Sequence, residues 1–132
     1  MEAKDEYNIS SIETKLDSLL RGTVSDNVFI SSIPSQLQSD WDDMVLIDLG
    51  TEVEDKDAYA DGLVDIALYA RPIGDDNEKN VPRLDALEKA LNVVINASAD
   101  TDFRIARVRA HSDFDTNIFW HCNVVTLNLR VY

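Results

Sequence analysis

The sequence predicts an α+β fold in a single domain spanning residues 1–132, with a mainly antiparallel sheet and helices packed on one face. Three observations support this prediction. Segments with helix and strand patterns follow one another in the order α-β-β-β-α-β-β, the last two strands form a long hairpin, and several strands alternate between apolar and polar residues. Such alternation is typical of a sheet with one buried face, and strands joined by short turns pair antiparallel.

A short amphipathic helix is the first predicted element. Its apolar residues recur at helical spacing, at Ile12, Leu16, Leu19 and Leu20. Ser10 and Glu13 have the spacing of a capping box, which marks a helix N-terminus, and Gly22 ends the run. Residues 1–9 precede the apolar run, and we expect them to form a disordered arm.

Three strands are expected next. Residues 27–32 and 44–49 are rich in β-forming residues, and Pro34 breaks the pattern between them. Residues 51–61 hold five carboxylates against one lysine and are expected to form a solvated acidic loop. Residues 63–71 alternate in polarity, which indicates a third strand with one face on a core.

A longer helix and the final hairpin complete the order. An apolar stripe predicts a helix over Val81–Ala97, and Pro82 suits its first turn. The stripe comprises Leu84, Leu87, Leu91, Val94 and Ile95. Residues 103–111 and 118–132 read as strands joined by a turn at residues 112–117, so the chain is expected to end in a long hairpin.

The overall charge excludes several function classes. A net charge of −13 and a pI near 4.3 argue against nucleic-acid readout, which depends on lysine and arginine contacts with phosphates. No apolar run approaches the roughly 18 residues that a membrane span requires, and the first residues lack the features of a secretion signal. A single cysteine, Cys122, excludes an internal disulfide. We therefore expect a cytosolic protein with no membrane partner.

The charge is unevenly distributed along the chain. Residues 101–132 hold four arginines against three aspartates, a net charge of +1. The whole chain carries −13, so residues 1–100 carry −14. This split predicts self-association, in which the arginines of the hairpin face acidic loops of a neighbouring copy. Exposed tryptophan would serve as an anchor for such a contact. The candidate interface residues are Arg104, Arg107, Arg109, Arg130, Glu54, Asp55, Asp57, Asp75, Asp76 and Trp120.

Candidate catalytic and metal-binding residues do not form a known pattern. His111 and His121 match no zinc spacing. Asp48 suits the first carboxylate of a restriction-type nuclease, but the strand containing Asp65 offers no lysine beside it. The acidic runs have oxygens that could bind Mg²⁺ or Ca²⁺, yet they lack EF-hand spacing, and a solvated charge run is favoured. We therefore expect no catalytic, cofactor or metal site, and no enzyme activity.

The layout resembles that of tail terminator and minor tail, or head-tail joining, proteins of long-tailed phages and related prophages. The matching stretches are residues 27–34, 63–71, 83–91 and 123–132. The resemblance implies a virion structural protein that forms a homo-oligomer, with a hexameric ring as the expected form, and docks to tail-tube or neck proteins. It also implies a location in the host cytoplasm during assembly and in the virion tail afterwards.

An alternative of a different class stays open on the sequence alone. A cytosolic acidic binding module or inhibitor, with no virion role, would use its negative surface to imitate nucleic acid or to bind a basic partner. Such a protein is expected to be a monomer or dimer that captures one basic host protein.

Overall fold

The computed structural model describes residues 8–56 and 58–132. Its elements follow the order α1 (Ile9–Leu20), β1 (Val28–Ile30), β2 (Asp43–Asp55), β3 (Ala60–Ala70), α2 (Val81–Ala97), β4 (Phe103–Asp115) and β5 (Trp120–Val131). This confirms the predicted α+β class and the order α-β-β-β-α-β-β. The bounds of α2 are those predicted, because Asn80 caps it by accepting a hydrogen bond from the backbone nitrogen of Arg83 at 3.2 Å.

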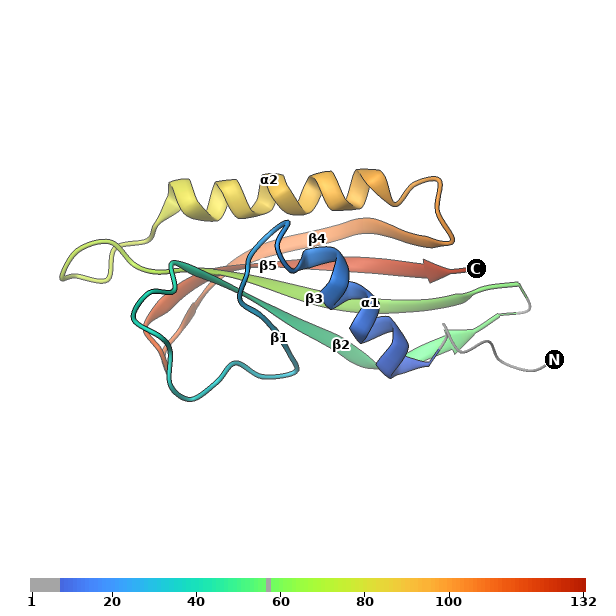
Figure 1. Cartoon of the computed structure of the whole chain (residues 1–132), viewed down its shortest axis with the longest axis horizontal. Helices are drawn as coiled ribbons and strands as arrows, with labels where there is room; N and C mark the ends of the chain where they lie inside the picture. The colour runs from blue at the N-terminus through green and yellow to red at the C-terminus, as the bar shows by residue number, and fades with distance from the viewer. Residues whose placement is uncertain (1–7, 57) are drawn as a thin grey trace.

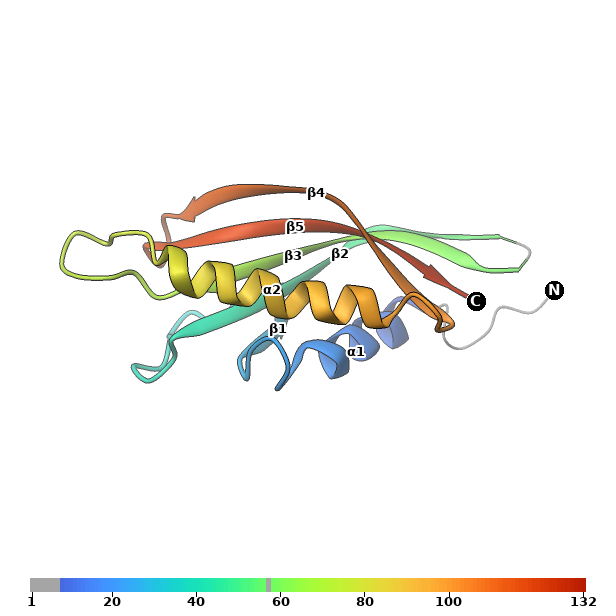
Figure 2. The same cartoon turned by 90° about the horizontal axis from the view of Figure 1, so that it is seen from above.

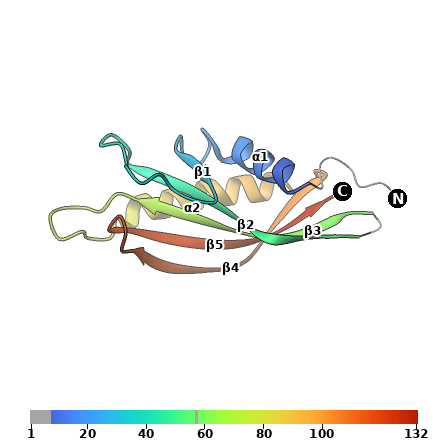
Figure 3. The same cartoon turned by 90° about the horizontal axis from the view of Figure 1, so that it is seen from below.

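The five strands form one sheet in the order β1-β2-β3-β5-β4. β1 runs parallel to β2, and all other neighbouring strands are antiparallel. Figure 1 shows α2 lying along the length of the sheet, with α1 beside it over β1 and β2. Figures 2 and 3 show that both helices lie on the same face, as predicted. We call this the helical face of the sheet, and the opposite side the outer face.

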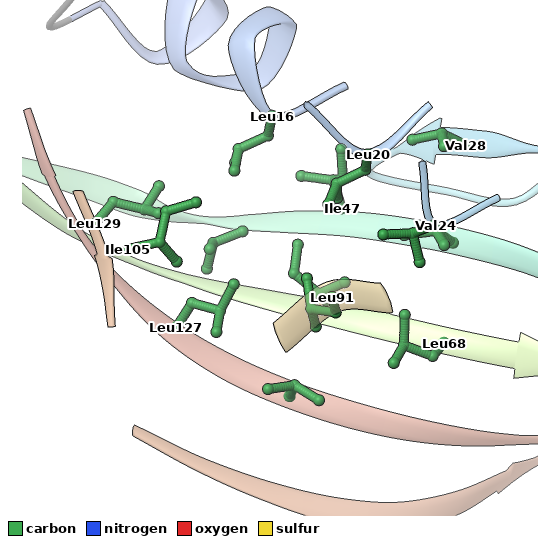
Figure 4. Packing of buried hydrophobic residues seen from close by; sticks show 14 of the residues in the cluster. Leu16, Leu20, Val24, Val28, Ile47, Leu68, Leu91, Ile105, Leu127 and Leu129 are labelled. Atoms are coloured by element: carbon green, nitrogen blue, oxygen red, sulfur yellow. The ribbon is translucent and has the colours of Figure 1, made fainter. Parts of the chain in front are cut away.

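The main core fills the space between the helices and the sheet. Ile47, Leu68 and Leu127 come from β2, β3 and β5, and Leu16 and Leu91 come from the two helices (Figure 4). Each of these side chains is at most 1% exposed. Complete burial of one such aliphatic side chain contributes about 1.5–3 kcal/mol. The alternating residues of β3 and β5 therefore fix which face of the sheet the helices must cover.

The start of α1 differs from the prediction. The helix begins at Ile9 with Asn8 as its N-cap, and no side-chain hydrogen bond caps it, so Ser10 lies inside the helix instead of capping it. The helix end is as expected, since Gly22 adopts a φ of 81°, which favours glycine. The predicted arm falls mostly on residues 1–7, which lie outside the described residues.

The acidic segment is a hairpin and not the predicted loop. β2 continues to Asp55 and β3 begins at Ala60, and the two strands pair there after a register shift between Leu49 and Val53. Charge does not prevent a strand when its side chains reach water, and the backbone ladder still forms. Figure 1 shows this hairpin projecting past the end of the helices.

The outer face carries a second, smaller core that the sequence did not predict. Met44, Tyr69, Trp120 and Cys122 are buried there. The segment between β1 and β2 covers them with Ile33, Leu37 and Trp41. β3 therefore has apolar neighbours on both faces near its C-terminal end, where the prediction placed only one face on a core.

The last hairpin is longer than predicted. β4 extends to Asp115, so the turn falls at residues 116–119 instead of 112–117. The backbone nitrogen of Phe119 donates to the carbonyl oxygen of Asp115 at 2.7 Å and closes the turn. None of the helices in the described parts of the chain is long and apolar enough to cross a membrane.

Replacing Leu68 should reveal the cost of opening the main core. Leu68→Ala is expected to lower the free energy of unfolding by about 2–5 kcal/mol, because it leaves a cavity beneath the helices. Leu63→Ala provides a matched control on the same strand, since Leu63 is 49% exposed, and its effect should stay within about 0.5 kcal/mol. Urea unfolding measures both values, and similar losses for the two variants would contradict the assigned faces of β3.

Candidate interaction surfaces

Two of the hairpin arginines gather with tyrosines at the end of the sheet where β4 begins. Arg130 donates from Nε to Oδ1 of Asp61 at 2.9 Å, and its guanidinium lies 4.3 Å from the centre of the Tyr59 ring. The hydrogen bond to Asp61 raises the pKa of Arg130 above its ordinary value. Arg104 pairs across the strands with Arg130 and lies 4.4 Å from the centre of the Tyr132 ring. Both charges remain accessible at this end.

The other two arginines point to opposite faces of the sheet. Arg107 lies opposite Leu127 and approaches Glu88 of α2, with Nη1 3.5 Å from Oε2. A register shift follows, and Arg109 then lies opposite Thr126 on the outer face. Among the described residues Arg109 has no hydrogen-bond or ion-pair partner. The four arginines therefore do not form one cationic patch.

The acidic candidates divide between the two ends of the sheet. Glu54 and Asp55 lie near the tip of the β2–β3 hairpin, where Glu54 pairs with Lys56 at 2.5 Å. Asp57 lies outside the described residues. Asp75 and Asp76 are exposed at the opposite end, in the loop before α2.

The loop that carries Asp75 and Asp76 is fastened to the last hairpin. Nε2 of His121 lies 3.1 Å from the carbonyl oxygen of Asn77, and Nζ of Lys79 donates to Oγ of Ser112 at 2.6 Å. These bonds hold the acidic loop beside the turn at residues 116–119. Figure 1 shows the loop and this turn at the same end of the molecule.

Trp120 lies in the second core instead of on the surface. Its side chain is 4% exposed, and the guanidinium of Arg71 lies 4.9 Å from its ring centre. Arg71 is itself held by the carbonyl oxygen of Trp41, which accepts from its Nε at 2.7 Å. Trp120 therefore stabilises the packing of the outer face and is covered where an interface anchor would need to be exposed.

Strand pairing also determines where the residues considered for catalysis lie. Asp48 and Asp65 lie opposite each other on β2 and β3, and the hydroxyl of Thr126 donates to Asp65 at 2.5 Å. The His121 ring packs 4.6 Å from the Phe114 ring, and His111 is exposed. Within residues 8–56 and 58–132 no three His, Cys, Asp or Glu side chains gather as a metal-binding group.

An apolar groove between the helices is a feature that the sequence pattern did not reveal. It has a volume of about 530 Å³ and is open to solvent. Leu19 of α1 forms one wall, Ala90 and Val94 of α2 form the other, Phe103 lies at its end, and Lys15 stands at its rim. The signal in the sequence is the pair of alanines Ala90 and Ala97, which leave space on the side of α2 that faces α1.

Cys122 is the only thiol of the chain, and it is shielded. It lies opposite Tyr69 on one side and Asp113 on the other. Burial raises the pKa of Cys122 to about 11, and the negative charges of Asp113 and Asp115 add to this effect. Burial likewise raises the pKa of Tyr69 above its ordinary value. This thiol is therefore a packing group and a poor nucleophile at neutral pH.

Comparisons with known proteins find a likeness in structure but no match to a protein family. No protein-family model matches the chain, and no curated protein matches it either. Among solved structures, a chain from the virion of a native gene transfer agent particle is 17% identical, with a TM-score of 0.45. The match covers 91% of this chain and 89% of that chain.

The shielding of Cys122 should be visible in its pH profile. Alkylation by iodoacetamide is expected to stay slow in the folded protein until the pH nears 11, whereas the unfolded chain in urea should react from about pH 8.5. Between these values the unfolded state binds fewer protons than the folded state, so stability falls as the pH rises. Cys122→Ser should remove that part of the pH dependence. Equal alkylation profiles for the folded and unfolded chains would contradict the shielding.

Proposed function

We propose that this chain is a non-enzymatic virion structural protein of a phage or prophage, a tail terminator or minor tail component. Copies assemble into a ring, hexameric by the family resemblance, and the ring docks to tail-tube or neck proteins. Assembly takes place in the host cytoplasm, and the finished protein resides in the virion tail. No residue is assigned a catalytic, cofactor or metal-binding role.

The observation that carries the proposal is the separation of unpaired charge along the sheet. Asp75 and Asp76 are exposed at one end, and Arg104 is exposed beside Arg130 at the other. β4 runs between these ends for 13 residues, a distance of about 40 Å at about 3.3 Å per residue. One molecule therefore cannot bring its own acidic loop to its own arginines, whereas two copies placed head to tail can.

Head-to-tail contact of this kind gives a ring when the rotation between copies closes, and an open filament when it does not. Two different surfaces of the same chain meet, so every added copy presents a fresh free surface until the rotation closes the ring. The net charge of −13 makes most encounters between copies repulsive. Complementary ends then select one orientation, which gives specificity more than raw affinity.

The confirmed order of elements supports the family resemblance on which the tail assignment rests. The projecting β2–β3 hairpin offers a separate surface for tail-tube or neck proteins, and we propose Glu54, Asp55 and Asp57 as its contacts. Arg109 has an exposed charge on the outer face and stays a candidate for the same role. Arg107 has a weaker claim because it already approaches Glu88.

Charge reversal at either end should abolish self-association. The wild-type chain is expected to form a defined oligomer at low ionic strength, and added salt should weaken it. Asp75→Lys with Asp76→Lys should leave a monomer, because the arginine end then meets like charge, and Arg104→Glu should do the same. Sedimentation velocity at several salt concentrations measures the outcome.

Two substitutions on the exposed face of α2 control for the sign of the charge change. Asp85→Lys matches the sign of the change at Asp75, and Lys89→Glu matches that at Arg104. These residues form an exposed i,i+4 pair, which contributes little to stability, so both controls should still assemble. A wild-type chain that stays monomeric at high concentration and captures one basic host protein would contradict ring assembly and support the acidic binding module.

A further inference from the structure

Phe119 forms an exposed aromatic knob at the tip of the last hairpin. Its side chain is 56% exposed and its φ is 60°, in the left-handed region that glycine and asparagine adopt far more readily than a bulky residue. The Phe114 ring lies 6.3 Å away and supports it from one side only. The left-handed φ belongs to the turn, which the Phe119 N–H closes onto the carbonyl oxygen of Asp115, but the turn does not require an exposed aromatic ring at this position, and strained residues are concentrated at functional sites.

The groove between α1 and α2 has the shape and chemistry to receive an aromatic ring. Its volume of about 530 Å³ falls in the range of pockets that bind compact apolar groups. Ala90 and Ala97 leave room on the α2 wall, and Leu19 and Phe103 supply apolar contact. Val93, at the rim, is 69% exposed, so this wall has no cover within the described part of the chain.

The knob and the groove lie at opposite ends of β4. Phe103, which lines the groove, is the first residue of this strand, and the turn that carries Phe119 follows directly after its last residue, Asp115. In Figure 1 the C-terminal end of α2 and the tip of the last hairpin likewise lie at opposite ends of the molecule. A chain therefore cannot fill its own groove with its own knob.

The charges at the two ends indicate that a second copy occupies the groove, and they determine which of its ends enters. The knob end carries five carboxylates, Asp75, Asp76, Glu78, Asp113 and Asp115, against the two cations Lys79 and Arg71, and the Arg71 guanidinium lies 4.9 Å from the Trp120 ring centre. At the groove end Lys15 and Arg104 lie near Asp100 and Asp102, with the acidic β2–β3 hairpin beyond them, and within the described residues neither cation has an ion-pair partner. Two knob ends would repel each other strongly, whereas a knob end meets free cations at a groove end.

We propose that Phe119 of one copy inserts into the groove between α1 and α2 of the next copy. This contact rests on the proposed function and supplies the apolar anchor of the head-to-tail interface. Aromatic side chains in well-packed pockets typically dominate the energy of an interface, and surrounding charges orient the partners. Lys15 at the rim then faces the carboxylates that flank the incoming ring.

Phe119→Gly separates association from folding. Glycine relaxes the left-handed turn, so the urea midpoint of the monomer should be unchanged or raised, while association should fall at least 100-fold. Val93→Glu should disable the groove instead of the knob, and because Val93 is exposed, the substitution removes no buried contact. Val108→Glu, at a valine that is 50% exposed on β4 and away from the groove, should assemble like the wild type.

Mixing the two blocked variants provides the decisive measurement. Phe119→Gly keeps an intact groove and Val93→Glu keeps an intact knob, so together they should form a one-to-one dimer that grows no further. Sedimentation velocity of each variant alone and of the mixture gives the result. A wild-type oligomer that both variants also form would overturn the knob-in-groove contact while leaving self-assembly in place. A wild-type chain that stays monomeric would overturn both proposals.

Discussion

The apolar faces of β3 and β5 must be kept from water, and the arrangement of the rest of the molecule depends on that requirement. Leu68 and Leu127 lie on these central strands and are at most 1% exposed. α2 covers β3 and β4, and α1 covers β1 and β2 on the same face, which leaves the other face to the segment between β1 and β2 and to charged side chains. The two helices lie side by side without running parallel (Figure 1), and a groove lies open between them.

Charges on this fold are positioned by strand register more than by order in the sequence. The shift beside Val108 turns Arg107 towards α2 and Arg109 towards the outer face, although only one residue separates them. Arg104 and Arg130 meet because they pair across β4 and β5. The body of the sheet thus separates these cations from the acidic loop at its other end, so the two ends of the molecule carry different charged groups.

Local patterns predicted those parts of the fold that local physics determines. The bounds of α2 follow from an apolar stripe and a capping asparagine, and the faces of β5 follow from strict alternation. Tertiary contacts determined the rest. Pairing with β3 carries β2 through a segment whose acidic composition favours a loop, and packing of Ile33 and Leu37 buries Trp120. The groove depends on the angle between two helices, which periodicity within either helix does not encode.

The position of β5 has a consequence for the order of events during synthesis. This strand is the last element of the sequence, yet it lies between β3 and β4, and its bond from Thr126 to Asp65 joins residues 61 positions apart. Such distant pairing is slow to form, and the sheet cannot close until β5 has left the ribosome. A nascent chain without β5 therefore lacks the β4–β5 hairpin, which forms one end of the sheet. Until β5 has paired, the end of the sheet that carries the β4–β5 turn is absent, so this end forms late in folding.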